Sequence, residues 1–412
     1  MSTTEVGHEP TGDTPFPDPE PFTHTGGKLL VARRLLGPPW PRVLRLLIPA
    51  LAFLAVREIG LLVLDWLAGR DNTTVTGALS SWDGQWFLGI AGGGYGGVPG
   101  GLADAFGRRT ADTPLAFFPG YPMLVRLLTQ VPGIGLLAAA FIVTLASGVV
   151  AAYGLDRLGR QVTGAPRAGL ILVVLFAASP MGVVLSMTYS EATFCALAVW
   201  SLVGLLERRW LLAGLAAAGA GLVRPTAAAL VLTVLIAAGI AVAAKRDGWR
   251  PWVGGLLAPL GLLGYLVAVG WLMGSPGGWF TLQREGWNSR FDFGAATVKF
   301  GLEVLADGRS VLEVGTVAIL LVAIGLVVVM IRQRLPWPLI VYGALVLAID
   351  LGSNGLMNSK ARLLLPAFTL LLPPAVALAK SRRGTLITAL AAIVLASAWF
   401  GGYAITGWQY AI

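Results

Sequence analysis

The segment LLIPALAFLAVREIGLLVLDWL, residues 46–67, is apolar along nearly its whole length and follows Arg42 and Arg45. A helix of this length, rising about 1.5 Å per residue, crosses the ~30 Å hydrocarbon core of a bilayer. Apolar runs of roughly 18 or more residues recur as far as residue 406. Because backbone polar groups within lipid must be satisfied inside the segment, such runs favour helices. The sequence therefore predicts an all-α, polytopic integral membrane protein.

The composition supports this fold class and excludes others. Of the 412 residues, 56% are hydrophobic and 12% are charged, against roughly 25% charged in soluble domains. The net charge of +9 comes from short basic clusters between apolar runs, so we interpret it as a topology signal and not as a nucleic-acid surface. Cys195 is the single cysteine and is interpreted as a small buried hydrophobe, which leaves no cysteine metal site.

Histidine is absent from the apolar part of the chain, since His8 and His24 both lie in the N-terminal tail. Acid–base chemistry in the membrane must therefore use Asp or Glu, with Lys or Tyr as further candidates. We predict no cofactor and no metal ligand set, although a divalent metal ion stays open as an alternative.

The positions of the basic clusters indicate the topology, because Arg and Lys near span ends are retained in the cytoplasm. Residues 1–40, rich in Pro, Gly, Thr and acids, are predicted to form a disordered cytoplasmic tail, and residues 41–412 one transmembrane domain. Placing every compact cluster inside gives about eleven crossings and an outward C-terminus. The predicted spans are 46–67, 134–155, 168–187, 192–206, 210–223, 226–244, 251–273, 310–331, 337–351, 363–379 and 386–405.

Two large loops then lie outside the membrane, residues 68–113 and residues 274–309. Residues 115–131, broken by prolines, are interpreted as an interfacial or re-entrant segment. If this segment crosses fully, the count becomes twelve and the alternation of basic clusters breaks downstream.

The first external loop contains SSWDGQWFLGIAGGGYG, residues 80–96. Trp82, Trp86 and Phe87 are side chains that prefer the membrane interface, so they predict interfacial helix in this loop. Asp83 would then face a crevice between water and lipid. The alternative is that Asp83 caps the helix, and the spacing alone does not decide between them. The glycines are interpreted as helix termination and close packing, since no predicted strand precedes them and no P-loop pattern is present.

Several other polar side chains fall on the same predicted outer side. Arg224 is a candidate cation at a span end, with snorkelling to the interface as the alternative. Glu191 is a candidate partner of a cation or of a hydroxyl-rich substrate, with a helix N-cap turn as the alternative. Arg57 and Glu58 in the first span are interpreted as structural, with a catalytic Glu58 left open. The remaining candidates for contacts to a substrate or lipid phosphate are Arg284, Arg290, Lys360, Arg362, Trp82, Tyr189 and Trp287.

Four stretches together resemble the PIG-V-like mannosyltransferases, relatives of the second GPI mannosyltransferase in the GT-C fold class. They are SSWDGQWFLGIAGGGYG, AFFPGYPMLVRLL, the long run from SMTYSEA to GLVRPTAAAL, and SKARLLLPAF. The resemblance covers most of residues 46–380. Bacterial members of this kind occur in actinobacteria, which agrees with a composition rich in Arg, Ala and Gly.

The resemblance implies a glycosyltransferase that takes mannose from a polyprenyl-phosphate donor on the outer face of the cytoplasmic membrane. It also implies that Asp83 is the catalytic carboxylate. One general base suffices for an inverting displacement when the leaving group is a phosphate. The acceptor would be a lipid-linked, glycan or protein hydroxyl, and Arg224, Lys360 or Arg362 would stabilise the departing phosphate.

Two other functions stay open at this point. A polytopic lipid or solute transporter would show repeat symmetry and broken helices at the membrane midplane, and the sequence has no clear repeat. A non-catalytic partner of a glycosyltransferase is the other alternative, because a single sequence does not show whether its acid is used.

Overall fold

The computed structural model describes residues 42–308, 310–355 and 357–408. All regular structure in these residues is helical, apart from one isolated bridge between Phe291 and Ser353. The all-α prediction is thus confirmed for the described part of the chain. The tail predicted to be disordered, residues 1–40, lies outside the described residues.

The first half of the described chain contains two long helices and several short ones. The α-helices are α2 (Arg42–Arg70), α3 (Val75–Leu79), α4 (Asp83–Gly93), α5 (Gly120–Leu128), α6 (Leu136–Thr163), α7 (Pro166–Ala177), α8 (Glu191–Leu206) and α9 (Trp210–Gly221). Three 3-10 helices accompany them, η1 (Tyr95–Gly97), η2 (Thr113–Ala116) and η3 (Gly182–Ser186).

The second half continues in the same way. Its α-helices are α10 (Ala227–Ala243), α11 (Arg250–Leu257), α12 (Leu260–Leu272), α13 (Gly278–Trp287), α14 (Ala295–Asp307), α15 (Val311–Arg332), α16 (Trp337–Gly352), α17 (Lys360–Leu363), α18 (Leu372–Lys380) and α19 (Arg383–Thr406). The 3-10 helices are η4 (Met357–Ser359) and η5 (Leu365–Leu371).

Among the described residues, five helical segments are long and apolar enough to cross a membrane. They are Leu46–Arg70, Leu136–Thr163, Arg250–Leu272, Val311–Arg332 and Arg383–Thr406. A sixth is the pair Met357–Leu363 and Leu365–Lys380, which is bent by 55°. The chain is thus a multi-pass membrane protein. The prediction of eleven crossings stays a prediction, because α7, α8, α9, α10 and α16 are apolar but have only 12 to 17 residues.

Prolines lie at breaks in three of the predicted spans. In the predicted span 251–273, Pro259 lies between α11 and α12. In the predicted span 168–187, α7 ends at Ala177 and the chain turns at Pro180 before η3. In the predicted span 363–379, Pro366 lies in η5, just after the bend between Leu363 and Leu365. Proline has no backbone N–H and clashes with the preceding turn, so within a helix it favours a kink or a break. The segment 115–131, in contrast, contains α5, whose nine residues rise only about 14 Å and cannot cross the bilayer core.

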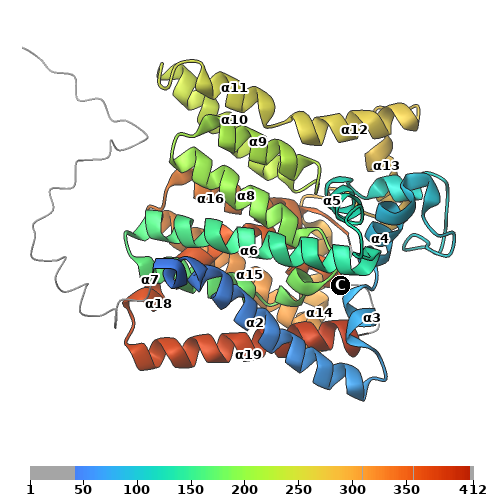
Figure 1. The fold of residues 1–412 in the computed structure, drawn as a ribbon, viewed down its shortest axis with the longest axis horizontal. Helices are drawn as coiled ribbons and strands as arrows, with labels where there is room; N and C mark the ends of the chain where they lie inside the picture. Colours follow the sequence, from blue (N-terminus) through green and yellow to red (C-terminus); the bar gives the residue numbers. More distant parts are fainter. Residues whose placement is uncertain (1–41, 309, 356, 409–412) are drawn as a thin grey trace, which may run out of the picture. The chain divides into compact units, whose positions relative to one another are not determined.

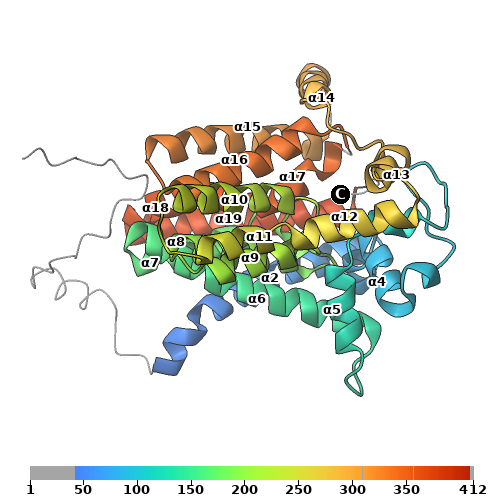
Figure 2. The ribbon, with the colours of Figure 1, turned by 90° about the horizontal axis from the view of Figure 1, so that it is seen from above.

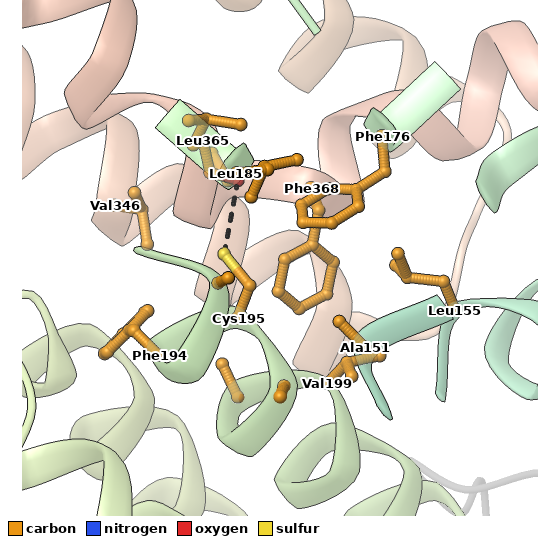
Figure 3. Close-up of a cluster of buried hydrophobic side chains, with 14 of the residues drawn as sticks. Ala151, Leu155, Phe176, Leu185, Phe194, Cys195, Val199, Val346, Leu365 and Phe368 are labelled. Carbon is orange, nitrogen blue, oxygen red and sulfur yellow. Dashed lines mark hydrogen bonds between the residues drawn. The ribbon is translucent and has the colours of Figure 1, made fainter. Parts of the chain in front are cut away.

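The main apolar core surrounds α8, which packs against α6 and α9. Nearly every residue of α8 is buried, as expected for a helix that is apolar on all sides. Figure 3 shows Cys195 of α8 among Phe176, Leu365 and Phe368, with its thiol directed at the Leu365 carbonyl. The interpretation of Cys195 as a buried hydrophobe is confirmed.

The short helices of the two large loops gather at one end of the helical body. In both views α4, α5 and α13 lie at the right, whereas α7 and α18 lie at the left (Figures 1 and 2). The left end carries the basic junctions, with Arg160 and Arg167 around the start of α7 and Arg382 at the start of α19. The acidic and aromatic motifs therefore lie at the end opposite these basic clusters.

Candidate active site

Asp83 is the first residue of α4 and its carboxylate pairs with an arginine from the far end of the sequence. Arg362 Nη1 donates to Asp83 Oδ2 over 2.7 Å, and the Asp83 side chain is 30% exposed. The N-cap residue of α4 is Trp82, which makes no side-chain cap bond. The alternative that Asp83 merely caps its helix is therefore wrong. Within the described residues, Arg362 is the partner of this carboxylate, which leaves Oδ1 available.

Tyr189 and Arg362 together hold the first turn of α4. The Tyr189 hydroxyl accepts a hydrogen bond from the Asp83 backbone N–H over 3.2 Å. The Arg362 guanidinium carbon lies 5.2 Å from the centre of the Tyr189 ring, a cation–π contact. Burial raises the pKa of the Tyr189 phenol well above its usual range, and the negative charge of Asp83 adds to this shift. The phenol therefore stays protonated at neutral pH.

Glu191 and Arg224 form a second ion pair beside the first. Glu191 is the first residue of α8 and is fully buried, and its Oε1 lies 2.7 Å from Arg224 Nη1. Arg224 Nη1 also donates to Ser190 Oγ over 3.0 Å. The Arg224 side chain thus turns inward, so the snorkelling alternative is wrong. Glu191 lies in the first turn of α8, as the alternative of a helix N-cap turn expected, and it also pairs with a cation.

The two pairs form one cluster, because Arg362 Nε lies 3.6 Å from Glu191 Oε1. We call Asp83, Glu191, Arg224 and Arg362 the charge cluster. Its hydrogen bonding is incomplete in the described structure. Glu191 Oε2 and Arg224 Nε are buried without a hydrogen-bond partner, whereas Glu191 Oε1 and Arg362 Nε lie in ion-pair contacts that lack hydrogen-bond geometry. Spare donors suit phosphate or sugar oxygens, and spare acceptors suit hydroxyl groups, so the cluster can bind a polar ligand.

Two glycines allow the site segments to approach one another. A Cβ on Gly84 would lie 2.4 Å from Thr188 Oγ1, so only glycine lets α4 begin against this segment. The Thr188 N–H also donates to the Leu79 carbonyl over 2.9 Å. A Cβ on Gly120, within the FFPGYP stretch, would lie 2.8 Å from the Leu222 carbonyl, to which the Gly120 N–H donates. These contacts fix α4 and α5 against the segments that carry Tyr189 and Arg224.

An aromatic cluster lies beside the charge cluster and joins both large loops. Trp86 of α4 stacks on Phe117 with ring centres 5.1 Å apart. Trp287 of α13 contacts both rings edge-on, at 6.4 Å and 5.6 Å. Trp82 is half-buried and packs on the main core. The predicted candidates Trp82 and Trp287 are thus part of the wall around α4.

Three predicted cations lie outside the charge cluster. Lys360 is buried, and its ammonium group donates to the carbonyls of Asp350 and Ser353 at the end of α16. Arg284 is 58% exposed beside Glu285. Arg290 is also exposed, and its backbone exchanges hydrogen bonds with Asn354.

The residues that position the site were not predicted from the sequence. Ser190, Gly84 and Gly120 lie inside the motifs described above, but no sequence pattern indicates that Gly84 contacts Thr188 or that Gly120 contacts Leu222. As for metal binding, the described residues contain no group of three or more His, Cys, Asp or Glu side chains that could hold an ion.

Known proteins resemble this chain in part of its sequence and in its fold. No family model matches the chain. A stretch of 141 residues, 32% of the chain, is 36% identical to GPI alpha-1,6-mannosyltransferase 2 of Mus musculus and 34% identical to that of Homo sapiens. The matched part spans only 26% of the length of these relatives.

Among solved structures, ArnT from Cupriavidus metallidurans bound to undecaprenyl phosphate superposes with a TM-score of 0.52. The match covers 83% of this chain and 62% of ArnT at 15% sequence identity, so it shows the fold alone. ArnT is a GT-C glycosyltransferase. The chain is therefore a membrane protein of the GT-C fold, and a third of its sequence is similar to a GPI mannosyltransferase.

Proposed function

We propose that this chain is a membrane glycosyltransferase that transfers mannose from a polyprenyl-phosphate-mannose donor to an acceptor hydroxyl. One observation carries the proposal. A partly exposed carboxylate, Asp83, lies in a cluster whose two arginines each have a buried Nε that makes no hydrogen bond, although Arg362 Nε lies 3.6 Å from Glu191. Such a cluster offers a base to a hydroxyl group and two cations to a phosphate. The similarity to GPI mannosyltransferases supports mannose as the sugar, and the undecaprenyl phosphate bound to ArnT supports a polyprenyl carrier.

The proposed reaction is a single displacement with inversion at the anomeric carbon. The acceptor oxygen forms a bond to this carbon while the bond from the carbon to the phosphate oxygen breaks. The hydroxyl proton passes to Asp83, whose Oδ1 is not occupied by Arg362. Arg362 and Arg224 stabilise the negative charge on the departing polyprenyl phosphate through their spare donors. Tyr189 keeps Asp83 in position through the backbone of α4.

Transfer by the purified protein in nanodiscs tests this proposal. The donor is synthetic polyprenyl-phosphate-mannose, the acceptors are extracted membrane lipids and glycans, and the products are measured by mass spectrometry. We expect wild-type transfer and a loss of about 10²- to 10⁴-fold for Asp83→Asn, because the amide cannot accept the proton. Asp71→Asn, an exposed acid of the same loop, is the matched control and should match wild type. If Asp83→Asn transfers mannose as well as wild type, Asp83 is not the general base. If wild type transfers no mannose, the proposed mannosyltransferase activity is rejected.

The site is further proposed to lie on the outer face of the cytoplasmic membrane. The basic clusters support this orientation, because they gather at the end opposite α4 and α13 (Figure 1). Reporter fusions at Arg160, Lys245 and Arg382 should be active only in the cytoplasm. If only periplasmic reporters are active at all three positions, the proposed orientation is wrong.

A further inference from the structure

Arg57 is a buried cation in the middle of the first membrane helix and is not part of the charge cluster. Its Nε donates to Ser186 Oγ and its Nη1 to the Ala177 carbonyl, each over 2.9 Å. Among the described residues, no carboxylate forms an ion pair with it. A cation inside the hydrocarbon region is costly unless a counter-charge or water accompanies it. The two neutral acceptors therefore leave the positive charge of Arg57 uncompensated.

Arg57 lines a cavity of about 700 Å³ between α2, α3, α6 and η3. This volume is in the range of ligand pockets, roughly 300 to 1,000 Å³. Two charged side chains line it, Arg57 and Glu58, and the polar lining is completed by Thr76, Thr144 and Ser186. The rest of the lining is apolar and includes Leu54, Leu61, Leu79, Phe141, Leu145 and Leu185. The cavity is thus suited to a molecule with a long hydrocarbon part and one charged group.

The rim of the cavity lies on the membrane-facing surface. Leu51 of α2 and Leu145 of α6 line the cavity and are 50% and 43% exposed. Both lie in segments long and apolar enough to cross the bilayer. A ligand can therefore enter from the lipid between these two helices, which favours a lipid over a soluble anion.

The cavity is separate from the charge cluster, but the segment that carries Tyr189 also lies next to the cavity. None of the four charged residues of the cluster lines it. Ser186 lies three residues before Tyr189, and Thr144, another lining residue, donates to the Met187 carbonyl. The segment from Met187 to Tyr189 therefore stands between the two sites.

We propose that this cavity is a binding site for an anionic lipid whose phosphate group pairs with Arg57. The hydrocarbon chains lie along the apolar lining between α2 and α6 and leave through the rim at Leu51 and Leu145. The phosphate neutralises Arg57 at depth, as a protein carboxylate would. Glu58 is exposed and repels an anion, so it weakens binding without occupying the phosphate position. This site does not depend on the reaction proposed above, since binding is measured in the absence of a sugar donor.

Native mass spectrometry of the purified full chain tests the site. The probes are phosphatidylglycerol, phosphatidylcholine and diacylglycerol with identical acyl chains, titrated onto delipidated protein. We expect phosphatidylglycerol to bind tightest. Arg57→Gln should weaken its binding about tenfold or more, through loss of a charge-assisted contact, whereas Arg57→Lys should retain most of it. Glu58→Gln should strengthen phosphatidylglycerol binding.

A second variant keeps the test decisive if Arg57→Gln fails to fold. Ala55→Phe adds bulk at an exposed position of the cavity lining and leaves Arg57 in place, so it should displace phosphatidylglycerol from a protein of wild-type thermal stability. Leu232→Phe on α10, exposed and outside the cavity, is the matched control. The proposal is overturned if Ala55→Phe binds phosphatidylglycerol like wild type, or if diacylglycerol or phosphatidylcholine binds as tightly as phosphatidylglycerol.

Discussion

Lys360 and Arg362 stand two residues apart on α17, both buried, yet they face different surroundings. The Lys360 ammonium group donates to two backbone carbonyls at the end of α16. Arg362 donates to Asp83, covers the Tyr189 ring and has a buried Nε that meets Glu191 only in an ion-pair contact of 3.6 Å. A cation at a helix C-terminus stabilises the orphan carbonyls there. A cation with a spare donor beside an exposed carboxylate is available to a ligand. We therefore expect Lys360 to act in the fold and Arg362 in the proposed site.

The largest expected effect is on Arg362. Arg362→Gln leaves Asp83 and Glu191 without this cation and removes a donor to the phosphate, so kcat/KM for the sugar donor should fall about 10²- to 10³-fold. Arg362→Lys restores the charge but not the planar guanidinium group, and it should recover only part of the loss. Steady-state kinetics in nanodiscs measure both. Wild-type kinetics for Arg362→Gln would show that the site does not use this residue.

Lys360→Met should lower the thermal stability of the protein more than its transfer activity, the opposite of what we expect for Arg362→Gln. The carbonyls of Asp350 and Ser353 would lose their charged donor, and leaving a buried acceptor unpaired costs about 1–3 kcal/mol. The thermal unfolding midpoint in detergent should therefore drop markedly. The protein that remains folded should keep kcat/KM within a few-fold of wild type. A Lys360→Met protein with normal stability and lost donor use would place Lys360 in the site.

Gly84→Ala tests how closely α4 must approach Thr188. The added Cβ would lie 2.4 Å from Thr188 Oγ1, and overpacking of this kind costs about 1–3 kcal/mol. We expect a lower unfolding midpoint and roughly tenfold slower transfer, because Asp83 moves with the helix. The double variant Gly84→Ala with Thr188→Ala removes the clash and should restore much of both properties. If the double variant is as impaired as Gly84→Ala, the steric explanation is wrong.

The smallest effects are expected at Arg284 and Arg290, the exposed loop cations. Arg284 pairs with Glu285 at the surface, and exposed pairs of this kind contribute about 0–1 kcal/mol. Arg284→Ala and Arg290→Ala should therefore leave kcat/KM for the donor within about twofold. A tenfold rise in KM for either variant would extend the donor site into the α13–α14 loop.

The sequence alone predicted the helical elements well where apolar runs were uninterrupted. The first span, residues 46–67, lies inside α2, and the span 310–331 coincides with α15. It predicted less well where proline intervened, since hydropathy does not distinguish a straight helix from one broken at Pro180 or Pro366. Hydropathy also does not decide the number of crossings, because five apolar helices have only 12 to 17 residues.

The amino-acid sequence by itself determined that the chain is helical and membrane-embedded, since hydrophobicity along the chain fixes which segments leave water. It also identified Asp83, Glu191, Arg224 and Arg362 as candidates, because charges near apolar runs are costly and rarely incidental. Only the tertiary structure decided which of them meet. Asp83 and Arg362 are 279 residues apart in the sequence, and their pairing depends on helix packing and on the absence of a side chain at Gly84. Pairing at such a separation is a property of the packed helices and has no local signal.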